Sequence, residues 1–553
     1  MLQVAEIVEI GIQQKEGGMV KKKWLLGIGV VVLFTLSILG AGSETSEVEL
    51  RVAKTSDAVS LDPHDAAAGP SMEVYVNIYE ALTRVAPDGT IKPWLALSWE
   101  RIDDYTVRFY LRKGVKFHDG TDFNATAVKF SVERAIDPDN PARVAGSLGP
   151  IAGVEVVDDY TVDIFTSEPY GPVPLAMSYF IAVGIVSPAA VKKYGEDFGM
   201  HPVGTGPFRF VEWIPNQRIV LERFPDYWGE PAKLDRIVYK VIPDPQAQHF
   251  ALERGEVDLL LNPEPARILH YRASPKYTVY ETQGLRVMFL GCDTAEGPTA
   301  NREIRKAIAH AIDANLICQA ILEGTAVPPD SFIAPSYFGY KNVHLRERYP
   351  YDPNRAREIL EELGWEDHNG DGLVESAAGQ TLEITIYAPE GRYPKDRETA
   401  IVVQYMLQKV GFDAKVVIEP WGTYIATLGK PGLEKGHEKY DLHLAGWASA
   451  PDAVQILEPL FHSSRMPPES CCNWFYYENP QIDSLLDAAR ASTDPSERAE
   501  LYGEVQDLLA EDLPIIPFAI LKEIVVARKE VVGYQIHPLD FYKGYFYTID
   551  IEK

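Results

Sequence analysis

The amino-acid sequence predicts a mixed α/β fold. From residue 48 onward, short runs rich in β-branched and aromatic residues, typical of strands, alternate with stretches whose apolar residues recur with the period of a helix. The chain has 553 residues, which predicts two to four domains at roughly 100–200 residues per domain. Its 53 basic and 80 acidic residues give a net charge of −27. Because nucleic acids require a basic surface, we expect no nucleic-acid partner.

The N-terminal region indicates export. Lysines at 21–23 precede an apolar run at 24–39 and small residues at 40–43, which is the order of a secretory signal. The run is long for a signal and short for a membrane span of about 20 residues. We therefore interpret residues 19–43 as a signal peptide or an uncleaved N-terminal anchor, and expect a periplasmic or cell-surface protein. No cysteine lies near the cleavage zone, so we do not expect a lipoprotein.

Residues 1–18 stand out of place ahead of that signal, because an export sequence normally begins with its basic residues. We interpret them as a mis-assigned start and expect translation to begin at Met19.

Two similar hairpins are expected in the first half of the chain. The segments "IDDYTVRFYL" and "VDDYTVDIFT", which begin at Ile102 and Val157, each place an acidic turn before an alternating strand, so we expect both in one sheet. Between them, "NATAVKFSVERAI" predicts a helix capped by Asn124 or Thr126. The inward face of this helix should hold Val128, Val132, Ala135 and Ile136.

The segment "VGTGPF" predicts a tight turn at Gly204 and Gly206 before the strand "FRFVEW", rather than a phosphate-binding loop. The sequence carries no P-loop, HExxH, GxSxG or GxGxxG fingerprint. We therefore expect no catalytic residues and no enzyme activity.

Three helices are predicted in the second half. "NREIRKAIAHAI" places its apolar residues on one face and its basic residues elsewhere, and Asp352-Pro353 begins another helix. Asp494-Pro495 begins a third with an N-cap and a proline at the first position. The buried stripes should be Ile304, Ala307, Ile308, Ala311 and Ile312 in the first of these helices, and Leu501, Val505, Leu508 and Leu509 in the third.

The four cysteines are too few to form a disulfide scaffold in an exported chain of this size. Cys292 and Cys318 lie in apolar contexts and should be buried thiols. The adjacent Cys471 and Cys472 leave two alternatives open, a vicinal disulfide or two packed thiols.

The stretch "LAGWASAPDAVQILEPLF", residues 444–461, predicts a strand that ends near Trp447, a turn at Pro451 and then a helix. Strand ends of this kind often hold ligands.

At this point several long segments carry a family resemblance. Residues 91–138, which include "DDYTVRFYLRKGVKFHDG", together with 201–229, 304–317 and 479–518, resemble the family 5 extracellular solute-binding proteins, the receptors of peptide, nickel and oligosaccharide ABC importers. The resemblance covers nearly everything from Val48 to the C-terminus.

The resemblance implies a periplasmic-binding-protein-like fold of type II with an extra domain, in which two lobes close around a hinge. Domain I would be discontinuous and domains II and III would each be continuous, with hinge crossings near residues 286 and 528. The implied boundaries are 48–88, 201–285 and 529–553 for domain I, 89–200 for domain II, and 286–528 for domain III.

The resemblance also implies a set of ligand-binding residues. Asp57 and Ala58 match the domain I strand whose backbone binds peptide in the family, and Asn262 matches a pocket residue of that domain. Trp421 and Trp447 match two tryptophans near the ligand, although core packing is the common fate of a strand tryptophan.

The resemblance also implies that the aspartate that usually pairs with a peptide's amino group is missing. In peptide-binding members the sequence after the strand tryptophan resembles Gly-Trp-x-x-Asp. Here Ala450 stands at the position of that aspartate, and the next acid, Asp452, follows Pro451. A peptide would need another acid, such as Asp452 or Asp57, because an unpaired buried ammonium is costly. An oligosaccharide could instead stack on the tryptophans and bond to Asn262 and Ser449, so both ligand classes stay open, with nickel or another small solute as a further alternative.

One segment resembles an ion-binding loop. "DHNGDGLVE" places oxygen ligands as in the first nine positions of an EF-hand loop, but Ala378 replaces the glutamate expected at the twelfth. Calcium and a plain Gly-Asp-Gly turn are the two interpretations. The candidate calcium ligands are Asp367, Asn369, Asp371 and Glu375, and we expect no other cofactor.

The function expected from the sequence is a monomeric exported receptor that captures a peptide or an oligosaccharide between two lobes. It would deliver the solute to an ABC permease driven by a separate ATPase subunit. An exported hydrolase and a chaperone-like protein are the alternatives from other classes.

Overall fold

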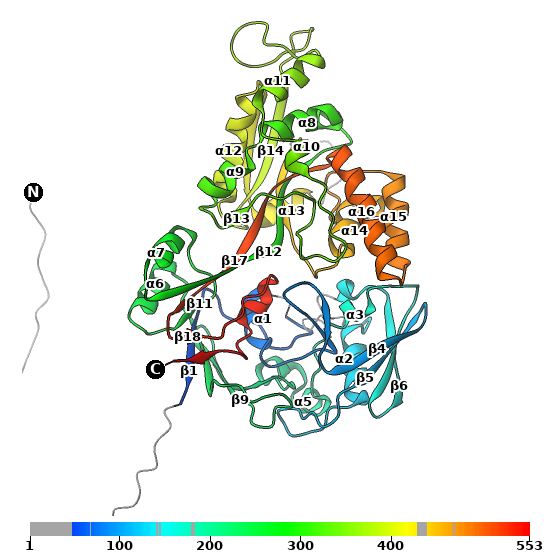
Figure 1. The fold of residues 1–553 in the computed structure, drawn as a ribbon, viewed down its shortest axis with the longest axis vertical. Coiled ribbons are helices and arrows are strands. Elements are labelled where there is room, and N and C mark those ends of the chain that lie inside the picture. Colours follow the sequence, from blue (N-terminus) through cyan, green and yellow to red (C-terminus); the bar gives the residue numbers. More distant parts are fainter. Residues whose placement is uncertain are drawn as a thin grey trace, which may run out of the picture. The chain divides into compact units, whose positions relative to one another are not determined.

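The computed structural model describes residues 47–552, apart from residues 67, 140, 141, 143, 144, 179–182, 429–439, 468 and 469. The segment interpreted as a signal or anchor, and the residues before it, lie outside the described residues. The described residues form one compact unit with the mixed α/β architecture that the sequence predicts (Figure 1).

Eleven strands of the described residues form the main sheet. Ten of them follow the order β15-β14-β16-β12-β17-β11-β1-β10-β9-β8, and the eleventh, β13, pairs with β17. The bounds of these strands are β1 Glu49–Lys54, β8 Phe208–Ile214, β9 Arg218–Arg223, β10 Arg236–Val241, β11 Leu259–Leu260, β12 Tyr277–Cys292, β13 Ala326–Val327, β14 Glu383–Glu390, β15 Asp413–Pro420, β16 Leu442–Trp447 and β17 Ile515–Arg528.

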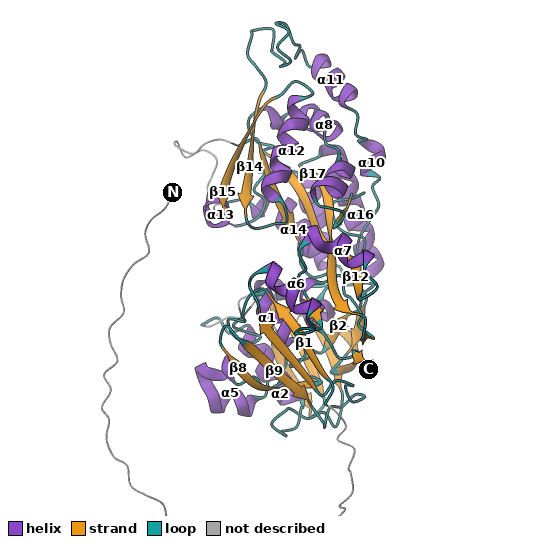
Figure 2. Cartoon of the chain, turned by 90° about the vertical axis from the view of Figure 1, so that its left-hand side faces the viewer, coloured by secondary structure: helices purple, strands orange, loops and turns teal. Residues whose placement is uncertain are grey.

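The long antiparallel strands β12 and β17 connect the two halves of this sheet (Figures 1 and 2). At one end β17 pairs with β11, which is parallel to β1, and at the other end β12 pairs with β16. The register between the two long strands shifts between Gln283 and Val287. A register shift of this kind bends and twists a strand. Whether the strands act there as a hinge, and where the domain boundaries fall, stay predictions.

The two predicted hairpins are confirmed and share a separate four-stranded sheet of order β4-β5-β7-β6. The strands are β4 Ala96–Asp103, β5 Thr106–Leu111, β6 Ile151–Asp158 and β7 Thr161–Thr166. Helix α2 (Ala125–Ala135) lies between the hairpins in sequence, and Asn124 caps it by accepting a hydrogen bond from the Ala127 backbone. Ile136, predicted to face inward, is only half-buried because it lies just past the end of the helix.

Helix α8 (Arg302–Ala311) buries the predicted apolar face, but the expectation that its basic residues lie elsewhere is wrong for Arg305. The Arg305 guanidinium is buried and donates to the carbonyl oxygens of Thr299, Ala300 and Asp512. The buried Arg305 cation is tolerated because its N–H groups donate to carbonyl oxygens that would otherwise lack a hydrogen-bond donor.

Helix α16 (Pro495–Asp512) begins as predicted at the Asp494 cap, whose carboxylate accepts from the Ser496 and Glu497 backbones. Val505 and Leu509 are buried, whereas Leu501 and Leu508 are half-buried. The other helices that concern the sites below are α1 Gly69–Tyr75, α6 Pro245–Glu253, α7 Ile268–Ala273, α11 Pro353–Glu362, α13 Trp421–Leu428, α14 Val454–Phe461 and α15 Pro480–Ala491.

Gly204 and Gly206 precede β8 as predicted, and packing explains why both are glycines. A Cβ atom on Gly204 would lie 2.1 Å from the Ile78 carbonyl oxygen, and one on Gly206 would lie 2.5 Å from that of Asn77. Such contacts are well inside van der Waals distance, so the two backbones can approach each other only without side chains.

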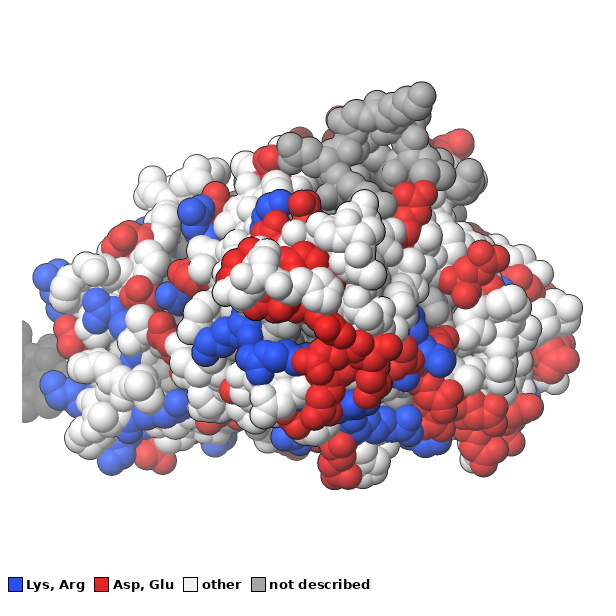
Figure 3. All heavy atoms as spheres, turned by 90° about the horizontal axis from the view of Figure 1, so that it is seen from above, with Lys and Arg blue, Asp and Glu red and all other residues white. Residues whose placement is uncertain are grey.

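Acidic side chains gather in extended groups on the face shown in Figure 3, with fewer basic ones among them. This agrees with the net charge of −27. Among the helices of the described residues, none is both long enough and apolar enough to span a bilayer.

Candidate functional site

The stretch at residues 444–461 forms the strand, turn and helix that the sequence predicts. Strand β16 ends at Trp447, and α14 begins at Val454. The indole N–H of Trp447 donates to the Gln455 carbonyl oxygen at 3.3 Å, and its ring lies 6.0 Å from that of Trp474. The Ser449 backbone N–H donates to the Tyr337 hydroxyl at 2.9 Å. These hydrogen bonds hold Trp447 and Ser449 in place, and both residues line a cavity.

That cavity has a volume of about 430 Å³, within the range of about 300–1,000 Å³ that small-molecule sites occupy. Two distant parts of the chain form it, the hairpin region around residues 146–170 and the region of residues 447–490. Its lining residues include Gly149, Glu168, Tyr170, Trp447, Ser449, Gln455, Glu458, Arg465, Cys471 and Arg490. We call this cavity the solute pocket.

The solute pocket contains charges of both signs. Arg490 contacts Glu168 through one terminal nitrogen, and its Nε lies 3.8 Å from the Glu458 carboxylate. Arg465 also pairs with Glu458, while the buried Nε of Arg465 has no hydrogen-bond partner among the described residues. Two arginines and two glutamates therefore face a small space, and a ligand that carries both an amine and a carboxylate would find opposite charges there.

Cys471 and Cys472 form a vicinal disulfide, which resolves the alternative that the sequence left open. Cys471 is exposed and lines the solute pocket, whereas Cys472 is buried. Cys292 and Cys318 are buried thiols, as predicted.

Two sequence candidates next to Trp447 lie behind the pocket wall. Ala450 is fully buried. Asp452 is also buried, and both of its carboxylate oxygens accept from Arg498 Nη2, at 2.9 and 2.8 Å. Neither residue lines the solute pocket, and the Asp452 carboxylate is committed to Arg498 in this structure.

Trp421 lies at the start of α13, outside the lining of the solute pocket. Its ring stacks on Tyr424 at 5.7 Å and meets Tyr393 edge-on at 6.1 Å, and the Arg392 guanidinium lies 5.3 Å above it. These contacts give Trp421 a packing role in a cluster of aromatic side chains, and its proposed contact with ligand stays a prediction.

Asp57 anchors a turn of the sheet edge. Its carboxylate accepts from the Trp213 indole N–H at 3.0 Å and from the Asn216 backbone at 2.7 Å. It also accepts from the backbone N–H of the buried Ala58 at 2.9 Å. Asp57 therefore holds the connection between β8 and β9.

Asn262 is exposed, but its side chain bonds to buried charged residues. Its amide donates to Glu73 at 3.0 Å, and its carbonyl oxygen accepts from Lys543 Nζ at 2.9 Å. Lys543 also pairs with Glu523 at 2.9 Å, and Lys54 lies 3.6 Å from Glu73. Burial raises the pKa of Glu523 and lowers that of Lys54. Both ends of the Asn262 side chain are thus used within the protein.

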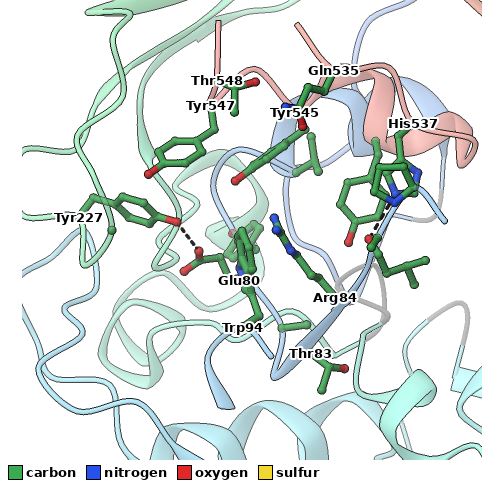
Figure 4. A pocket seen from close by; sticks show the side chains of 18 of the residues that line it. Glu80, Thr83, Arg84, Trp94, Tyr227, Gln535, His537, Tyr545, Tyr547 and Thr548 are labelled. Atoms are coloured by element: carbon green, nitrogen blue, oxygen red, sulfur yellow. Dashed lines mark hydrogen bonds between the residues drawn. The ribbon is translucent and has the colours of Figure 1, made fainter. Parts of the chain in front are cut away.

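A second cavity, of about 280 Å³, lies beside β2 (Thr83–Val85) and the C-terminal segment. Figure 4 shows its aromatic lining around Glu80 and Arg84. Glu80 accepts from the side chains of Tyr227, Trp228 and Thr205, each at 2.8 Å. Burial nevertheless raises the pKa of Glu80 to about 7. These three donors satisfy Glu80, whereas the buried Tyr79 hydroxyl, Arg84 Nε and Tyr545 hydroxyl, which line the same cavity, have no hydrogen-bond partner among the described residues.

The candidate calcium ligands also lie together, since Asp367, Asp371 and Glu375 each bring a carboxylate oxygen within 4.8 Å of the others. Asp367 accepts from the backbones of Gly370 and Gly372, and Glu375 accepts from the Asn369 amide. These hydrogen bonds are those of a structured turn, and calcium binding stays a prediction.

The sequence did not identify the four charged residues of the solute pocket, Glu168, Glu458, Arg465 and Arg490. They come from segments up to 322 positions apart, and no local pattern marks them. Among the sequence candidates, Trp447 and Ser449 line this pocket, and the adjacent cysteines, of which Cys471 also lines it, were a further nearby signal.

The described residues thus place a charged cavity between two distant parts of a mixed α/β chain, an arrangement suited to binding a small solute. Residues 90–468 match the family model described as bacterial extracellular solute-binding proteins, family 5 middle. The chain belongs to this family, whose members are solute-binding receptors that work outside the cytoplasm and are not enzymes.

Curated relatives and solved structures agree with this assignment. The chain is 31% identical over 531 residues to the glutathione-binding protein GsiB of Salmonella choleraesuis, which covers 93% of this chain and 96% of the relative. It resembles the periplasmic binding protein DppA of Helicobacter pylori in complex with the peptide STSA, at 28% identity and a TM-score of 0.71, over 91% of this chain and 98% of that one. NikA of Brucella suis in complex with Fe(III)-EDTA has 28% identity and a TM-score of 0.79, over 91% of this chain and all of the other.

Proposed function

We propose that this protein captures a short peptide with free termini, of the size class of glutathione or a tetrapeptide, in the solute pocket. It then presents the peptide, as a monomer, to the permease of an ABC importer that a separate ATPase subunit drives. The observation that carries the proposal is the pairing of Glu168 and Glu458 with Arg465 and Arg490 around one cavity.

The chemistry of a peptide fits this set of charges. A free peptide carries an ammonium at one end and a carboxylate at the other, and each must find a partner when it leaves water. Arginine binds carboxylates in a fixed fork geometry, and the glutamates can accept from the ammonium. Because the four pocket charges sum to zero, a zwitterion can enter without adding net charge to the pocket.

Two kinds of relative support the peptide class. The Salmonella relative is named for glutathione, which is a peptide, and the Helicobacter structure holds the peptide STSA. The sequence left peptide and oligosaccharide open. An uncharged sugar offers no charged group to the two arginines and two glutamates, which would stay paired only with one another. We therefore expect a sugar to bind the pocket more weakly than a peptide.

Isothermal titration calorimetry of the purified protein tests the proposal with three ligands: reduced glutathione, an unmodified tetrapeptide and a β-linked disaccharide. We expect at least one of the two peptides to bind and the disaccharide not to bind. The variant Trp447→Ala should weaken peptide binding by at least tenfold, or about 1.4 kcal/mol, because the indole forms part of the pocket wall.

The matched control is Trp365→Ala, since Trp365 is a half-buried tryptophan that follows α11 and does not line the solute pocket. It should leave peptide affinity unchanged. Tight binding of the disaccharide with no binding of either peptide would overturn the proposal.

A further inference from the structure

Helices α6 and α7 bring together three metal-ligating side chains away from the solute pocket. One ligand atom from each of His249, Glu253 and His270 lies within 4.8 Å of the others. The two helices lie side by side in both ribbon views (Figures 1 and 2). None of the three side chains lines either cavity described above.

The chain positions these residues by simple helix geometry. His249 and Glu253 are four residues apart on α6 and so lie on one face of the helix. His270 comes from α7, and its ring centroid lies 5.5 Å from that of His249 with the ring planes at 79°. The two helices thus bring both imidazole rings and the Glu253 carboxylate to one place.

The spacing suits a shared metal ion better than a direct hydrogen bond. His249 Nε2 lies 3.6 Å from the Glu253 carboxylate, which is too long for a direct hydrogen bond. Two ligands on a tetrahedral zinc, each bonded at about 2.0–2.1 Å, lie about 3.3 Å apart. The His249–Glu253 pair is thus within a few tenths of an ångström of that separation, and His270 offers a ring nitrogen within 4.8 Å of both ligand atoms.

An outer contact already orients His249. The Tyr271 hydroxyl lies 2.9 Å from His249 Nδ1, and both side chains are buried. When Nδ1–H donates to this hydroxyl, Nε2 carries the lone pair and faces Glu253. Metal-binding histidines commonly have such a partner on the second ring nitrogen, where it fixes the tautomer and the ring orientation.

An ion can reach the group from solvent. Glu253 and His270 are exposed, and of the three side chains only His249 is buried. The adjacent cation, Arg267, lies three residues before His270 and is paired with Glu264 at 3.2 Å. Because of this ion pair, the positive charge of Arg267 repels a metal ion at the site less strongly.

We propose that His249, Glu253 and His270 form a binding site for one divalent transition-metal ion of the zinc class. Two imidazoles and one carboxylate are the ligands that zinc accepts when a fourth position stays open to water. The bound ion would join α6 to α7. The site is separate from the solute pocket and does not depend on the proposed peptide.

Zinc titration of the purified full chain tests the proposal, with calorimetry for affinity and elemental analysis after dialysis for stoichiometry. The informative variant is His270→Asn, since an exposed side chain can be changed without emptying the core. The matched control is His344→Asn. His344 is also exposed and lies 3.5 Å from a glutamate, Glu347, but it belongs to neither metal-ligating group of the described residues. Asn tolerates its left-handed backbone conformation.

We expect the parent and His344→Asn to bind one zinc ion with equal affinity and His270→Asn to bind it at least tenfold more weakly. Tyr271→Phe removes the outer contact and should weaken zinc binding by about 10- to 100-fold. Zinc should also raise the thermal midpoint of the parent but not that of His270→Asn, because an ion that binds only the folded state stabilises it.

Two outcomes would overturn the proposal. One is a parent protein that takes up no zinc. The other is a His270→Asn variant with the parent's stoichiometry and affinity. In the second case, loss of zinc in Asp371→Asn would assign the ion to the acidic turn at residues 367–375 instead.

Discussion

Arg498 Nη2 lies 2.9 and 2.8 Å from the two carboxylate oxygens of Asp452, and the two side chains are only 7% and 4% exposed. This pair fixes the turn between β16 and α14 against α16. It explains why the acid nearest to Trp447 in sequence is a structural residue, whereas more distant acids supply the charge of the solute pocket.

The first prediction concerns this ion pair. Asp452→Asn should destabilise the protein by about 3–5 kcal/mol, because it leaves the Arg498 cation buried without its counter-charge. The measurement is the free energy of unfolding in urea. Glu358→Gln is the control, since Glu358 pairs with Arg355 on the exposed face of α11, and exposed pairs contribute about 0–1 kcal/mol. Equal losses in the two variants would contradict the assignment.

The second prediction concerns Glu80, whose pKa burial raises from 4.5 to about 7. The folded protein therefore binds a proton here more tightly than the unfolded chain does. The stability that this proton gives is fully present below about pH 4.5 and is lost as the pH rises through 7, a loss of about 3 kcal/mol.

Glu80→Gln keeps the shape of the side chain and removes the titration. The free energy of unfolding of the parent, minus that of the variant, should fall between pH 4.5 and 7. A difference that is flat over this range would show that Glu80 keeps an ordinary pKa.

The third prediction separates two roles for Asn262. Its amide bonds to Glu73 and its carbonyl oxygen to Lys543, so Asn262→Ala should cost about 1–3 kcal/mol by leaving buried polar groups short of partners. Peptide affinity should stay within a factor of about two. Asn354→Ala controls for the loss of an asparagine, since Asn354 is exposed on α11 and its carbonyl oxygen accepts from Arg357. A tenfold loss of peptide affinity with unchanged stability would restore Asn262 to the ligand site.

The sequence predicted features that depend on local pattern. The hairpins that begin near Ile102 and Val157, the caps at Asn124 and Asp494, and the end of β16 at Trp447 all follow from spacing and residue type within a few positions. Family resemblance added the receptor class, which no single motif could supply.

What the sequence could not predict depends on contacts between distant residues. Glu168 and Arg490 form their pair across 322 positions, and Arg498 reaches Asp452 across 46. The side-chain environment of Asp57 was also hidden, because its donors, Trp213 and Asn216, come from a hairpin about 156 residues later. A charged residue in sequence shows its type, and only the fold shows whether its charge is already paired.

The last prediction concerns which carboxylate of the solute pocket binds the amino group of a peptide, and it rests on the proposed function. The sequence indicated that the usual carboxylate is missing, because Ala450 replaces the family's aspartate. Glu458 lies in the pocket wall instead, between Arg465 and Arg490. We therefore expect a free peptide to bind at least tenfold more tightly than its N-acetylated form, a difference of about 1.4 kcal/mol.

Glu458→Gln tests which residue is responsible. In this variant the free peptide should lose affinity while the acetylated peptide binds as before, because only the free peptide carries the ammonium that a carboxylate attracts. Glu478→Gln is the matched control, since Glu478 is an exposed glutamate near this region of the chain that does not line the pocket. Calorimetry on both peptides with all three proteins gives the result directly. If the parent binds free and acetylated peptides equally well, the amino group is not read by any carboxylate, and the inference drawn from Ala450 stands.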